Sequence, residues 1–311
     1  MPDADVIILG AGLAGLAAAR DLRDAGVDIL VIEARDRLGG RVWTRHQDGL
    51  DYPVELGPEW FDASGPMHRL LERSGARVHA ATGPFLQRTA KGLNAFDEVA
   101  DGGDELHRRL QQITGPDRSL QDALESCCGA TELTRARATL IAYVEGFHAA
   151  DPARVSLRWF TETEQSQPAD DAQYRSQDGA DAVVEILSSG LEGGGTVRLR
   201  SAARVIRWQP NSVQVDIEHQ GTIATLSARA VVVTLPLPVL ASAPGEPGSV
   251  TFAPEIGSKR DAMTGLAMGS VIKTVLAFDE PFWSGRGVLG EMLFVQDRRQ
   301  TMPTWWTTQP V

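Results

Sequence analysis

The opening segment constrains the fold of this chain more than any other part of it. Residues 6–9 are apolar and read as a buried strand, and a glycine-rich turn follows directly. Its three glycines have the spacing G-x-G-x-x-G: Gly10, Gly12 and Gly15. A helical stretch, residues 16–25, then leads to a second apolar strand, residues 29–32, which ends on Glu33. A strand, a glycine-rich turn, a helix and a strand that ends on an acid form the βαβ unit that binds dinucleotides.

The residue types in the turn suit the diphosphate of such a ligand. Gly10 permits the tight turn, Gly12 leaves room for phosphate to approach the backbone, and Gly15 lets helix and strand pack closely. The N–H groups and the dipole of the helix N-terminus, at Leu13 and Ala14, favour an anion.

Glu33 indicates which dinucleotide fits. Its carboxylate would accept hydrogen bonds from ribose hydroxyls, and its charge would repel a 2′-phosphate, which argues against NADP. The turn and the acid together do not distinguish NAD from FAD.

Charge and apolar content exclude several classes of protein. A chain of 311 residues with 42% hydrophobic residues can bury a sizeable core and form two domains. The net charge of −11 argues against nonspecific binding of nucleic acid or of an anionic membrane surface. The acidic start, residues 1–5, argues against a secretory signal, and the longest apolar run, residues 230–243, is too short to span a bilayer. Histidines and cysteines lack the spacing of metal ligands.

The two cysteines, Cys127 and Cys128, are adjacent in the sequence. Neighbouring cysteines rarely pair with each other, so we expect no disulfide. Unpaired thiols fit a reducing compartment, and we therefore expect a cytoplasmic protein.

Helical and strand-like segments occur in blocks that predict an α/β fold. We expect a Rossmann-like, FAD- or NAD-binding domain and a second, substrate domain that combines helices with an antiparallel or mixed sheet. The nucleotide domain comprises residues 1–78 and 176–262, and the substrate domain comprises residues 79–175 and 263–311. Helices are expected at 66–74, 104–113, from 119, 136–148, from 156 and 179–191. Strands are expected at 197–199, 205–208, 213–217, 230–235, 290–295 and 304–308. The run 230–235 is so apolar that we expect it to be buried on both faces.

Two segments near the start resemble the flavin-containing amine oxidases of the monoamine oxidase type. The first is residues 33–42, EARDRLGGRV, and the second is residues 54–61, VELGPEWF. The resemblance implies a flavoprotein with FAD as its cofactor. Beyond the turn and Glu33, the residues that it implies for FAD binding are Ala34, Arg35, Gly39, Gly40, Arg41, Leu56, Gly57, Pro58, Glu59 and Trp60.

Physical chemistry supports part of this set. Gly39 and Gly40 permit close approach of the backbone to a bulky cofactor, and Arg41 suits the charge of a diphosphate. For Arg35 and Arg37 the residues alone favour another interpretation, a solvated charged turn.

A later segment, residues 268–283, resembles the stretch of the same family that carries an active-site lysine. Its alternating pattern predicts a strand over residues 271–278, in which Lys273 is the only charged residue. A lysine in an apolar strand needs a partner or a function, and the alternative is an edge strand protected by a charge. The resemblance implies that Lys273 is catalytic and holds a water molecule near the flavin.

The reaction implied by the resemblance is oxidative deamination of an amine. The amine becomes an imine, which is hydrolysed, and O2 is reduced to hydrogen peroxide. An apolar, aromatic pocket would favour the neutral amine, and Trp305 or Trp306 is a candidate for its lining. The two alternate along a strand, so at most one faces such a pocket, and packing in the core is the alternative for both and for Trp60.

Members of the resembled family continue well past the equivalent of Val311. We therefore expect a shortened chain or one completed by a second polypeptide, with a homodimer as a further option. Two other functions stay open: a related flavin desaturase or amino-acid oxidase, and a nucleotide-binding subunit that needs a partner chain for activity.

Overall fold

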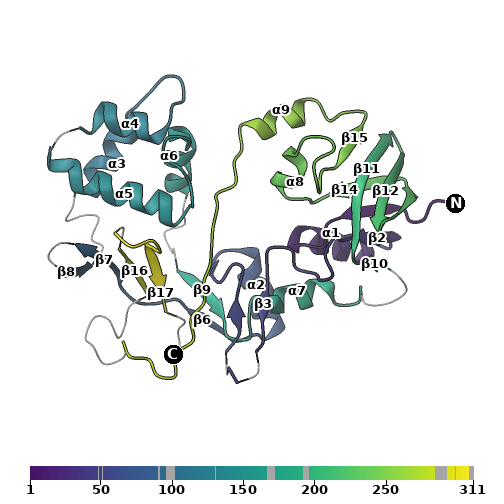
Figure 1. The fold of residues 1–311 in the computed structure, drawn as a ribbon, viewed down its shortest axis with the longest axis horizontal. Coiled ribbons are helices and arrows are strands. Elements are labelled where there is room, and N and C mark those ends of the chain that lie inside the picture. Colours follow the sequence, from purple (N-terminus) through teal and green to yellow (C-terminus); the bar gives the residue numbers. More distant parts are fainter. Residues whose placement is uncertain are drawn as a thin grey trace. The chain divides into compact units, whose positions relative to one another are not determined.

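The computed structural model divides the chain into two compact units (Figure 1). Unit 1 comprises Met1–His79 and Tyr174–Met268, and unit 2 comprises Ala80–Gln173 and Gly269–Val311. The structure describes residues 1–47, 49–50, 52–89, 92–95, 102–129, 131–166, 172–191, 196–283, 293–297 and 299–307.

A parallel sheet of four strands forms the centre of unit 1. Its strands, in spatial order, are β10 (Val197–Arg198), β2 (Ile29–Ile32), β1 (Val6–Leu9) and β14 (Ala230–Val233). The predicted strands at 6–9 and 29–32 are confirmed, and the helix between them is α1 (Leu13–Asp24).

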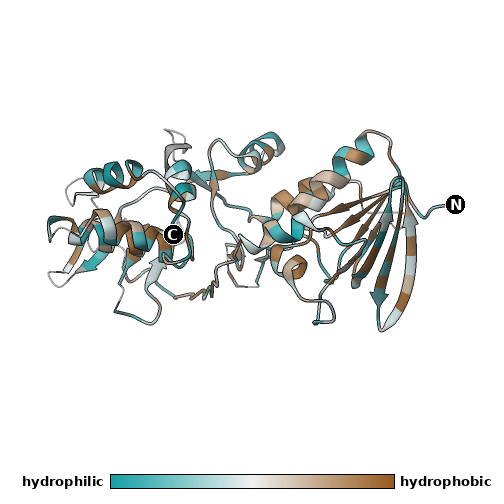
Figure 2. Ribbon diagram, turned by 90° about the horizontal axis from the view of Figure 1, so that it is seen from above, coloured by the Kyte–Doolittle hydropathy of each residue, from teal (hydrophilic) through white to brown (hydrophobic). Residues whose placement is uncertain are grey.

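Both faces of this sheet are covered, which explains why β1 and β2 are continuously apolar. Ile8 and Val31 face helices α1 and α7 (Asp181–Ser188), whereas Ile7 and Leu30 belong to a cluster with a second sheet. Successive side chains of a strand point to opposite faces, so each strand supplies both clusters. In Figure 2 several strands nearest the N-terminus are largely brown, the colour of apolar residues.

The second sheet of unit 1 also has four strands. They are, in spatial order, β13 (Thr222–Ala228), β12 (Ser212–His219), β11 (Ser201–Gln209) and β15 (Thr251–Ala253). The first three form an antiparallel meander, with Asn211 and Gly221 at positive φ in the two turns. The strands predicted at 205–208 and 213–217 are confirmed, whereas β13 was not predicted.

The prediction that 230–235 is buried on both faces is wrong. β14 lies at the edge of the parallel sheet as described, Ala230 is exposed, and the other three residues are only partly buried.

Short elements complete unit 1. The helices are α2 (Pro66–Ser74), α8 (Leu237–Ala241) and α9 (Ser258–Thr264). The strands are β3 (Thr44–Arg45), β4 (Val54–Glu55) and β5 (Phe61–Asp62), together with β6 (Val78–Ala80) and β9 (Gln173–Ser176) at the limits of the unit. The predicted helix 66–74 is confirmed, and Gly75 ends it in the left-handed conformation at φ 77°.

Unit 2 combines helices with a small mixed sheet. The helices are α3 (Gly103–Gln111), α4 (Leu120–Cys127), α5 (Thr134–Gly146) and α6 (Leu157–Ser166), with a 3-10 turn at Thr131–Leu133. The strands, in spatial order, are β17 (Thr304–Trp306), β16 (Phe294–Gln296), β7 (Phe85–Thr89) and β8 (Gly92–Ala95). One apolar cluster, which includes Leu106, Leu124 and Phe160, holds the helices together. Among the described residues, no helix is long and apolar enough to cross a membrane.

Two predictions for unit 2 are wrong. Residues 271–278 form no strand: Val271 and Ile272 are 73% and 91% exposed, and no strand of the described residues pairs with them. The alternating pattern alone therefore did not produce a strand, because a strand needs a hydrogen-bonded neighbour.

For the strands predicted at 290–295 and 304–308, β16 and β17 are the described parts, and residues 290–292 and 308 lie outside the described residues.

The second error concerns the cysteines, since Cys127 and Cys128 form a disulfide. Cys127 ends α4 and Cys128 has a non-helical φ of −130°, so the chain leaves the helix between the two sulfur-bearing residues. We expected a reducing, cytoplasmic setting because the thiols were expected to be unpaired, and the disulfide removes that reason.

We predict that Ser119→Ala destabilises unit 2 by about 1 kcal/mol. The Ser119 hydroxyl accepts a hydrogen bond from the Asp122 N–H at 3.1 Å and so caps the predicted start of α4. Urea unfolding followed by circular dichroism measures the loss. The control is Ser126→Ala, whose hydroxyl only donates to the Ala123 carbonyl within the same helix. Equal effects of the two substitutions would contradict the capping role.

Candidate functional site

The glycine-rich turn between β1 and α1 is packed so tightly that two of its glycines are structural. Gly10 has φ +100°, and its N–H donates to the Ile32 carbonyl at 2.8 Å. A Cβ on Gly15 would lie 1.9 Å from the Gly10 carbonyl oxygen, closer than any side chain allows. Thr234, directly after β14, packs against the start of the turn, and its hydroxyl donates to the Leu9 carbonyl at 2.8 Å. Thr234 was not singled out in the sequence, because no local pattern links it to the turn.

Gly12 differs from the other two glycines because the space beside it is open. The nearest atom to a Cβ built there is the Cα of Gly40, at 3.9 Å. Gly12 is also the N-cap of α1, and no side chain caps this helix end. The first turn of α1, with the exposed Ala14 and the partly buried Leu13, carries no acidic residue. Backbone N–H groups and the positive end of the helix dipole are thus left for an anionic ligand.

Glu33 lies beside the same turn and is only 8% exposed. Its carboxylate accepts one hydrogen bond from the Ala11 N–H and one from the Arg35 N–H, each at 2.8 Å. A carboxylate has about four lone-pair sites, so both oxygens retain capacity for further donors such as hydroxyl groups. Glu33 therefore lies against the glycine-rich turn, and its binding of ribose hydroxyls stays a prediction.

The segment after β2 returns to the glycine-rich turn. Gly39 donates from its N–H to the Ala11 carbonyl at 2.8 Å and forms a bridge with Gly12. Gly40 has φ +61°, and a Cβ on it would lie 3.0 Å from the Gly12 Cα. We expected these two glycines to leave room for a cofactor. The structure shows that they also leave room for the backbone of the glycine-rich turn, which packs directly against them.

Two arginine side chains hold the segment after β2 through hydrogen bonds to its backbone. Arg35 and Arg37 both donate to the Gly40 carbonyl, at 2.9 and 2.8 Å. Burial, followed by the positive charge of Arg35, holds the pKa of the Arg37 guanidinium below its usual value, and its carbon lies 4.8 Å from the Trp43 ring centroid. Arg37 is therefore partly buried against the loop, whereas the predicted site residues Ala34 and Arg41 are exposed. A role of Arg41 toward a diphosphate stays a prediction.

The second predicted segment, 54–61, packs on the first. A Cβ on Gly57 would lie 2.1 Å from the Arg41 carbonyl oxygen, and the Leu56 N–H donates to the Trp43 carbonyl at 2.8 Å. Leu56 and Pro58 are exposed and Trp60 is partly buried. Their contact with a cofactor stays a prediction.

Two buried acids in this segment have partners within the protein. Glu59 forms an ion pair with Arg175 at 2.9 Å, and both side chains are largely buried. Glu55, which sequence reasoning missed, accepts from the Ala180 N–H at 2.7 Å and from the Thr44 hydroxyl at 2.8 Å. Glu55 thereby ties β4 to the start of α7, a contact between residues 125 positions apart that local pattern does not reveal.

Lys273 belongs to unit 2, in the extended segment that follows Met268. It is partly buried, and its Nζ lies 5.4 Å from the centroid of the Trp306 ring, which is a cation–π distance. Trp306 also lies 6.0 Å from the Phe294 ring, whereas Trp305 is 42% exposed. Of the two tryptophans, Trp306 is the one that contacts the predicted catalytic lysine.

An aromatic cluster in the helices of unit 2 was not predicted. The rings of Tyr143, Phe147 and Trp159 lie 5.1, 5.3 and 5.7 Å from the His148 ring, all edge-on. Burial lowers the pKa of His148 below its ordinary value, so the neutral imidazole is favoured. Phe147 and Trp159 are about half exposed.

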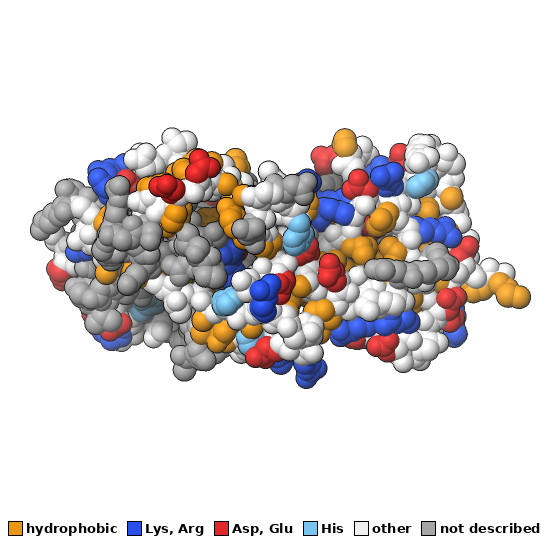
Figure 3. Space-filling view, turned by 90° about the horizontal axis from the view of Figure 1, so that it is seen from below, with side chains coloured by type: hydrophobic (Ala, Val, Ile, Leu, Met, Phe, Trp, Pro, Cys, Tyr) orange, Lys and Arg blue, Asp and Glu red, His pale blue; other side chains and the backbone are white. Residues whose placement is uncertain are grey.

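Figure 3 shows apolar side chains interspersed with acidic and basic ones on the face that it displays.

We predict that Glu33→Gln destabilises unit 1 by about 1–3 kcal/mol, because an amide NH2 would face one of the two backbone N–H groups and leave it unsatisfied. Thermal unfolding of the ligand-free protein measures the change. Glu185→Gln, on the exposed face of α7, is the matched control and should change stability by less than about 0.5 kcal/mol. A Glu33→Gln protein as stable as the control would contradict the structural role of the carboxylate.

Similar proteins agree on one family. The family model for flavin containing amine oxidoreductase matches residues 13–310. Polyamine oxidase 2 of Arabidopsis thaliana is 28% identical over 92% of this chain, and amine oxidase [flavin-containing] B of Sus scrofa is 25% identical over 93% of it. The chain spans 61% and 60% of the length of these two relatives.

Solved structures show the same fold. Cyclohexylamine oxidase from Brevibacterium oxydans superposes with a TM-score of 0.67 at 20% identity, covering 85% of this chain and 63% of its own. Putrescine oxidase bound to putrescine gives 0.66 at 22% identity, covering 84% and 63%. The resemblance noted in the sequence is confirmed, and the chain belongs to the flavin-containing amine oxidoreductase family.

Proposed function

We propose that this chain binds FAD through unit 1 and serves in the oxidation of an amine to an imine, with O2 reduced to hydrogen peroxide. One observation carries the proposal: the N-terminus of α1, which no side chain caps, and the Glu33 carboxylate meet at Ala11. Glu33 hydrogen-bonds to Ala11, the residue before the N-cap of α1. A helix end that binds anions and an acid that binds hydroxyl groups, so close together, suit the diphosphate and ribose of a dinucleotide. Membership of a flavin-containing family makes FAD the dinucleotide of choice.

The residues present fit this cofactor. The open space beside Gly12 is one that a Cβ would fill, and the first turn of α1 next to it offers backbone N–H groups and carries no acidic residue. Glu33 would bind the ribose hydroxyls, and Arg41 has an exposed side chain that suits a diphosphate. When bound, FAD would supply an acceptor for the hydride equivalent of the amine carbon and a route for its electrons to O2.

Unit 2 would serve the substrate. Lys273 has an ammonium group beside an aromatic ring and would donate a hydrogen bond to a water molecule near the reaction. The cluster around His148 is apolar and holds a neutral base, which suits an amine that must lose its proton before it reacts. Names of relatives such as polyamine oxidase and amine oxidase support an amine as the substrate.

A second candidate is a nucleotide-binding chain that needs further polypeptide for catalysis. It is favoured by the length of the chain, which spans about 60% of its curated relatives. Visible absorption of the purified chain with FAD, before and after an amine is added without O2, separates the two. Bleaching by the amine supports the oxidase, bound flavin that no amine bleaches supports the second candidate, and a failure to bind flavin contradicts both.

We predict that Gly12→Ala weakens FAD binding at least about tenfold, a loss of about 1.4 kcal/mol. Gly12 has φ −74°, which alanine adopts readily, and the nearest atom to a Cβ built there is 3.9 Å away, so the fold should survive. The added methyl group would occupy the approach of the phosphate. Titration of FAD by quenching of tryptophan fluorescence measures affinity. Gly265→Ala, with its nearest contact at 3.5 Å, is the control and should bind as the parent does. Unchanged affinity in Gly12→Ala would place the diphosphate elsewhere.

We predict that Lys273→Met lowers amine-dependent peroxide formation about a hundredfold, within the range expected for loss of a group that assists proton transfer. FAD affinity should stay within about twofold, because Lys273 belongs to the other unit. Lys259→Met, on the exposed surface of α9, is the control and should change neither quantity. Equal rates in the two variants would remove Lys273 from the catalytic residues.

A further inference from the structure

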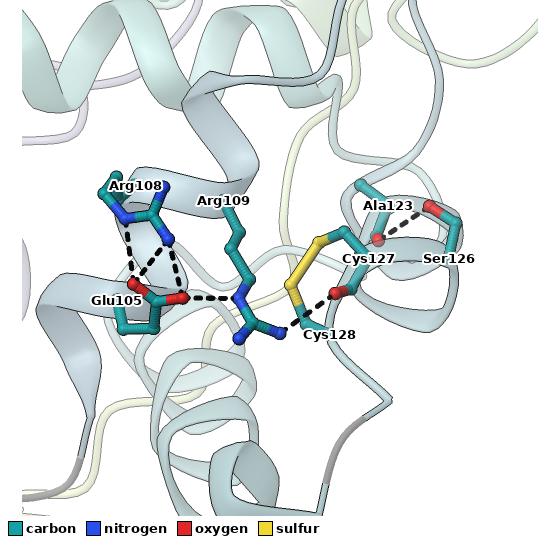
Figure 4. The surroundings of a disulfide bond; sticks show 7 residues. All are labelled: Glu105, Arg108, Arg109, Ala123, Ser126, Cys127 and Cys128. Carbon is teal, nitrogen blue, oxygen red and sulfur yellow. Dashed lines mark hydrogen bonds and ion pairs between the residues drawn. A yellow bond between two sulfur atoms is a disulfide. The ribbon is translucent and has the colours of Figure 1, made fainter.

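The bond between Cys127 and Cys128 joins adjacent residues at the end of α4 (Figure 4). A disulfide stabilises a fold mainly by restricting a loop of the unfolded chain, and the effect grows with the length of that loop. Adjacent residues enclose the shortest loop that exists, so this bond stabilises unit 2 little by that route. We propose that the pair is a reversible redox site, in which Cys127 reacts with peroxide and Cys128 completes the disulfide.

The two sulfur atoms have unequal surroundings. Cys128 is fully buried in the apolar cluster of the helices, where Leu124 and Leu133 are also buried. Cys127 is only partly buried at the edge of that cluster. A small oxidant in solution therefore reaches Cys127 first, because the burial of Cys128 shields its sulfur.

A positive charge lies next to Cys127. The Arg109 guanidinium donates to the Cys127 carbonyl at 3.5 Å and forms an ion pair with Glu105 at 2.6 Å, which fixes its position. Figure 4 shows the Arg109 side chain extending from α3 toward the disulfide. An arginine beside a thiol favours the thiolate, which is the reactive form. A reactive cysteine next to a resolving one is the arrangement that redox-sensing proteins use.

The chemistry balances with hydrogen peroxide as the oxidant. The Cys127 thiolate attacks one peroxide oxygen, the O–O bond breaks, hydroxide leaves, and Cys127 becomes a sulfenic acid. The Cys128 thiol then attacks that sulfur, the S–S bond forms, and the sulfenic oxygen leaves as water. A small dithiol reverses the process: its thiolate attacks Cys127, and Cys128 leaves and takes up a proton. The second thiol of the reductant then attacks the mixed disulfide, Cys127 leaves as a thiolate, and the reductant is released as a cyclic disulfide.

Opening of the bond would loosen the end of α4. The Cys128 N–H donates to the Leu124 carbonyl at 3.2 Å, and Arg109 of α3 donates to the Cys127 carbonyl at 3.5 Å, so both residues take part in contacts at the end of α4. The inference does not rest on the proposed oxidase activity, because peroxide is added as a reagent in each test.

The first test counts thiols in the chain of 311 residues. Both cysteines of this sequence lie in the pair, so maleimide labelling of the denatured chain reports on this site alone. We expect no label before treatment, two labels after dithiothreitol, and none after reduction and then peroxide, with the chain still monomeric under non-reducing conditions. Two labels that persist after peroxide, or a disulfide formed only between chains, would overturn the proposal.

The second test assigns the two roles. After reduction and peroxide treatment, Cys128→Ser should retain a sulfenic acid at Cys127 that dimedone traps, whereas Cys127→Ser should trap at least about tenfold less, since Cys128 is buried. Circular dichroism confirms that each variant is folded, and Cys128→Ala replaces Cys128→Ser if the buried hydroxyl unfolds it. Equal trapping in the two variants, or more in Cys127→Ser, would reverse or remove the assignment.

The third test concerns Arg109. If its charge favours the thiolate about tenfold, Arg109→Gln lowers the thiolate fraction by that factor, while the more basic thiolate reacts about threefold faster. Closure by peroxide should then be about threefold slower. Arg108→Gln is the matched control, because Arg108 pairs with the same Glu105 but not with the cysteines. Equal closure rates in both variants would overturn the role of Arg109.

Discussion

The architecture of unit 1 depends on the backbone of Ala11. Its N–H donates to the Glu33 carboxylate and its carbonyl accepts from Gly39, so one residue holds the end of β2 and the following segment against the glycine-rich turn. Both bonds are internal to the protein, and the carboxylate that takes part is largely buried. The turn that offers N–H groups to an anion is thus held in shape before any ligand arrives, which lowers the free energy that binding must spend on ordering.

Elements of the fold that arise from neighbouring residues were predictable. The strand–turn–helix–strand start, the left-handed stop at Gly75 and the cap at Ser119 each depend on residues a few positions apart. Elements that depend on distant partners were not. Residues 271–278 have a strand pattern but no neighbour among the described residues, and β14 is apolar although the described sheet ends there. β13 was missed because its first four residues are all exposed. They are therefore not selected for the alternation of apolar and polar residues that marks a half-buried strand.

The candidate site divides in the same way. Spacing alone indicated that the glycine-rich turn and Glu33 follow two neighbouring parallel strands, and in the structure Glu33 accepts from the Ala11 N–H of that turn. The contacts of Gly40 with Gly12 and of Thr234 with the turn arise from segments that meet only in three dimensions. The disulfide was beyond sequence reasoning for a related reason. Whether adjacent sulfur atoms meet is decided by the backbone at the end of α4, which no residue type specifies.

The interleaving of the two units along the chain dictates an order of events during synthesis. Gly10 contacts Thr234, which is 224 residues later, and β14 is the last strand of the parallel sheet to be made. At about 5–20 residues per second, β1 waits on the order of 10 to 45 seconds for that neighbour. The helices that the structure describes in unit 2 are encoded between 103 and 166 and leave the ribosome well before then. The helical part of unit 2 is therefore the first that can fold, and the apolar strands of unit 1 must stay apart from those of other chains until β14 is made.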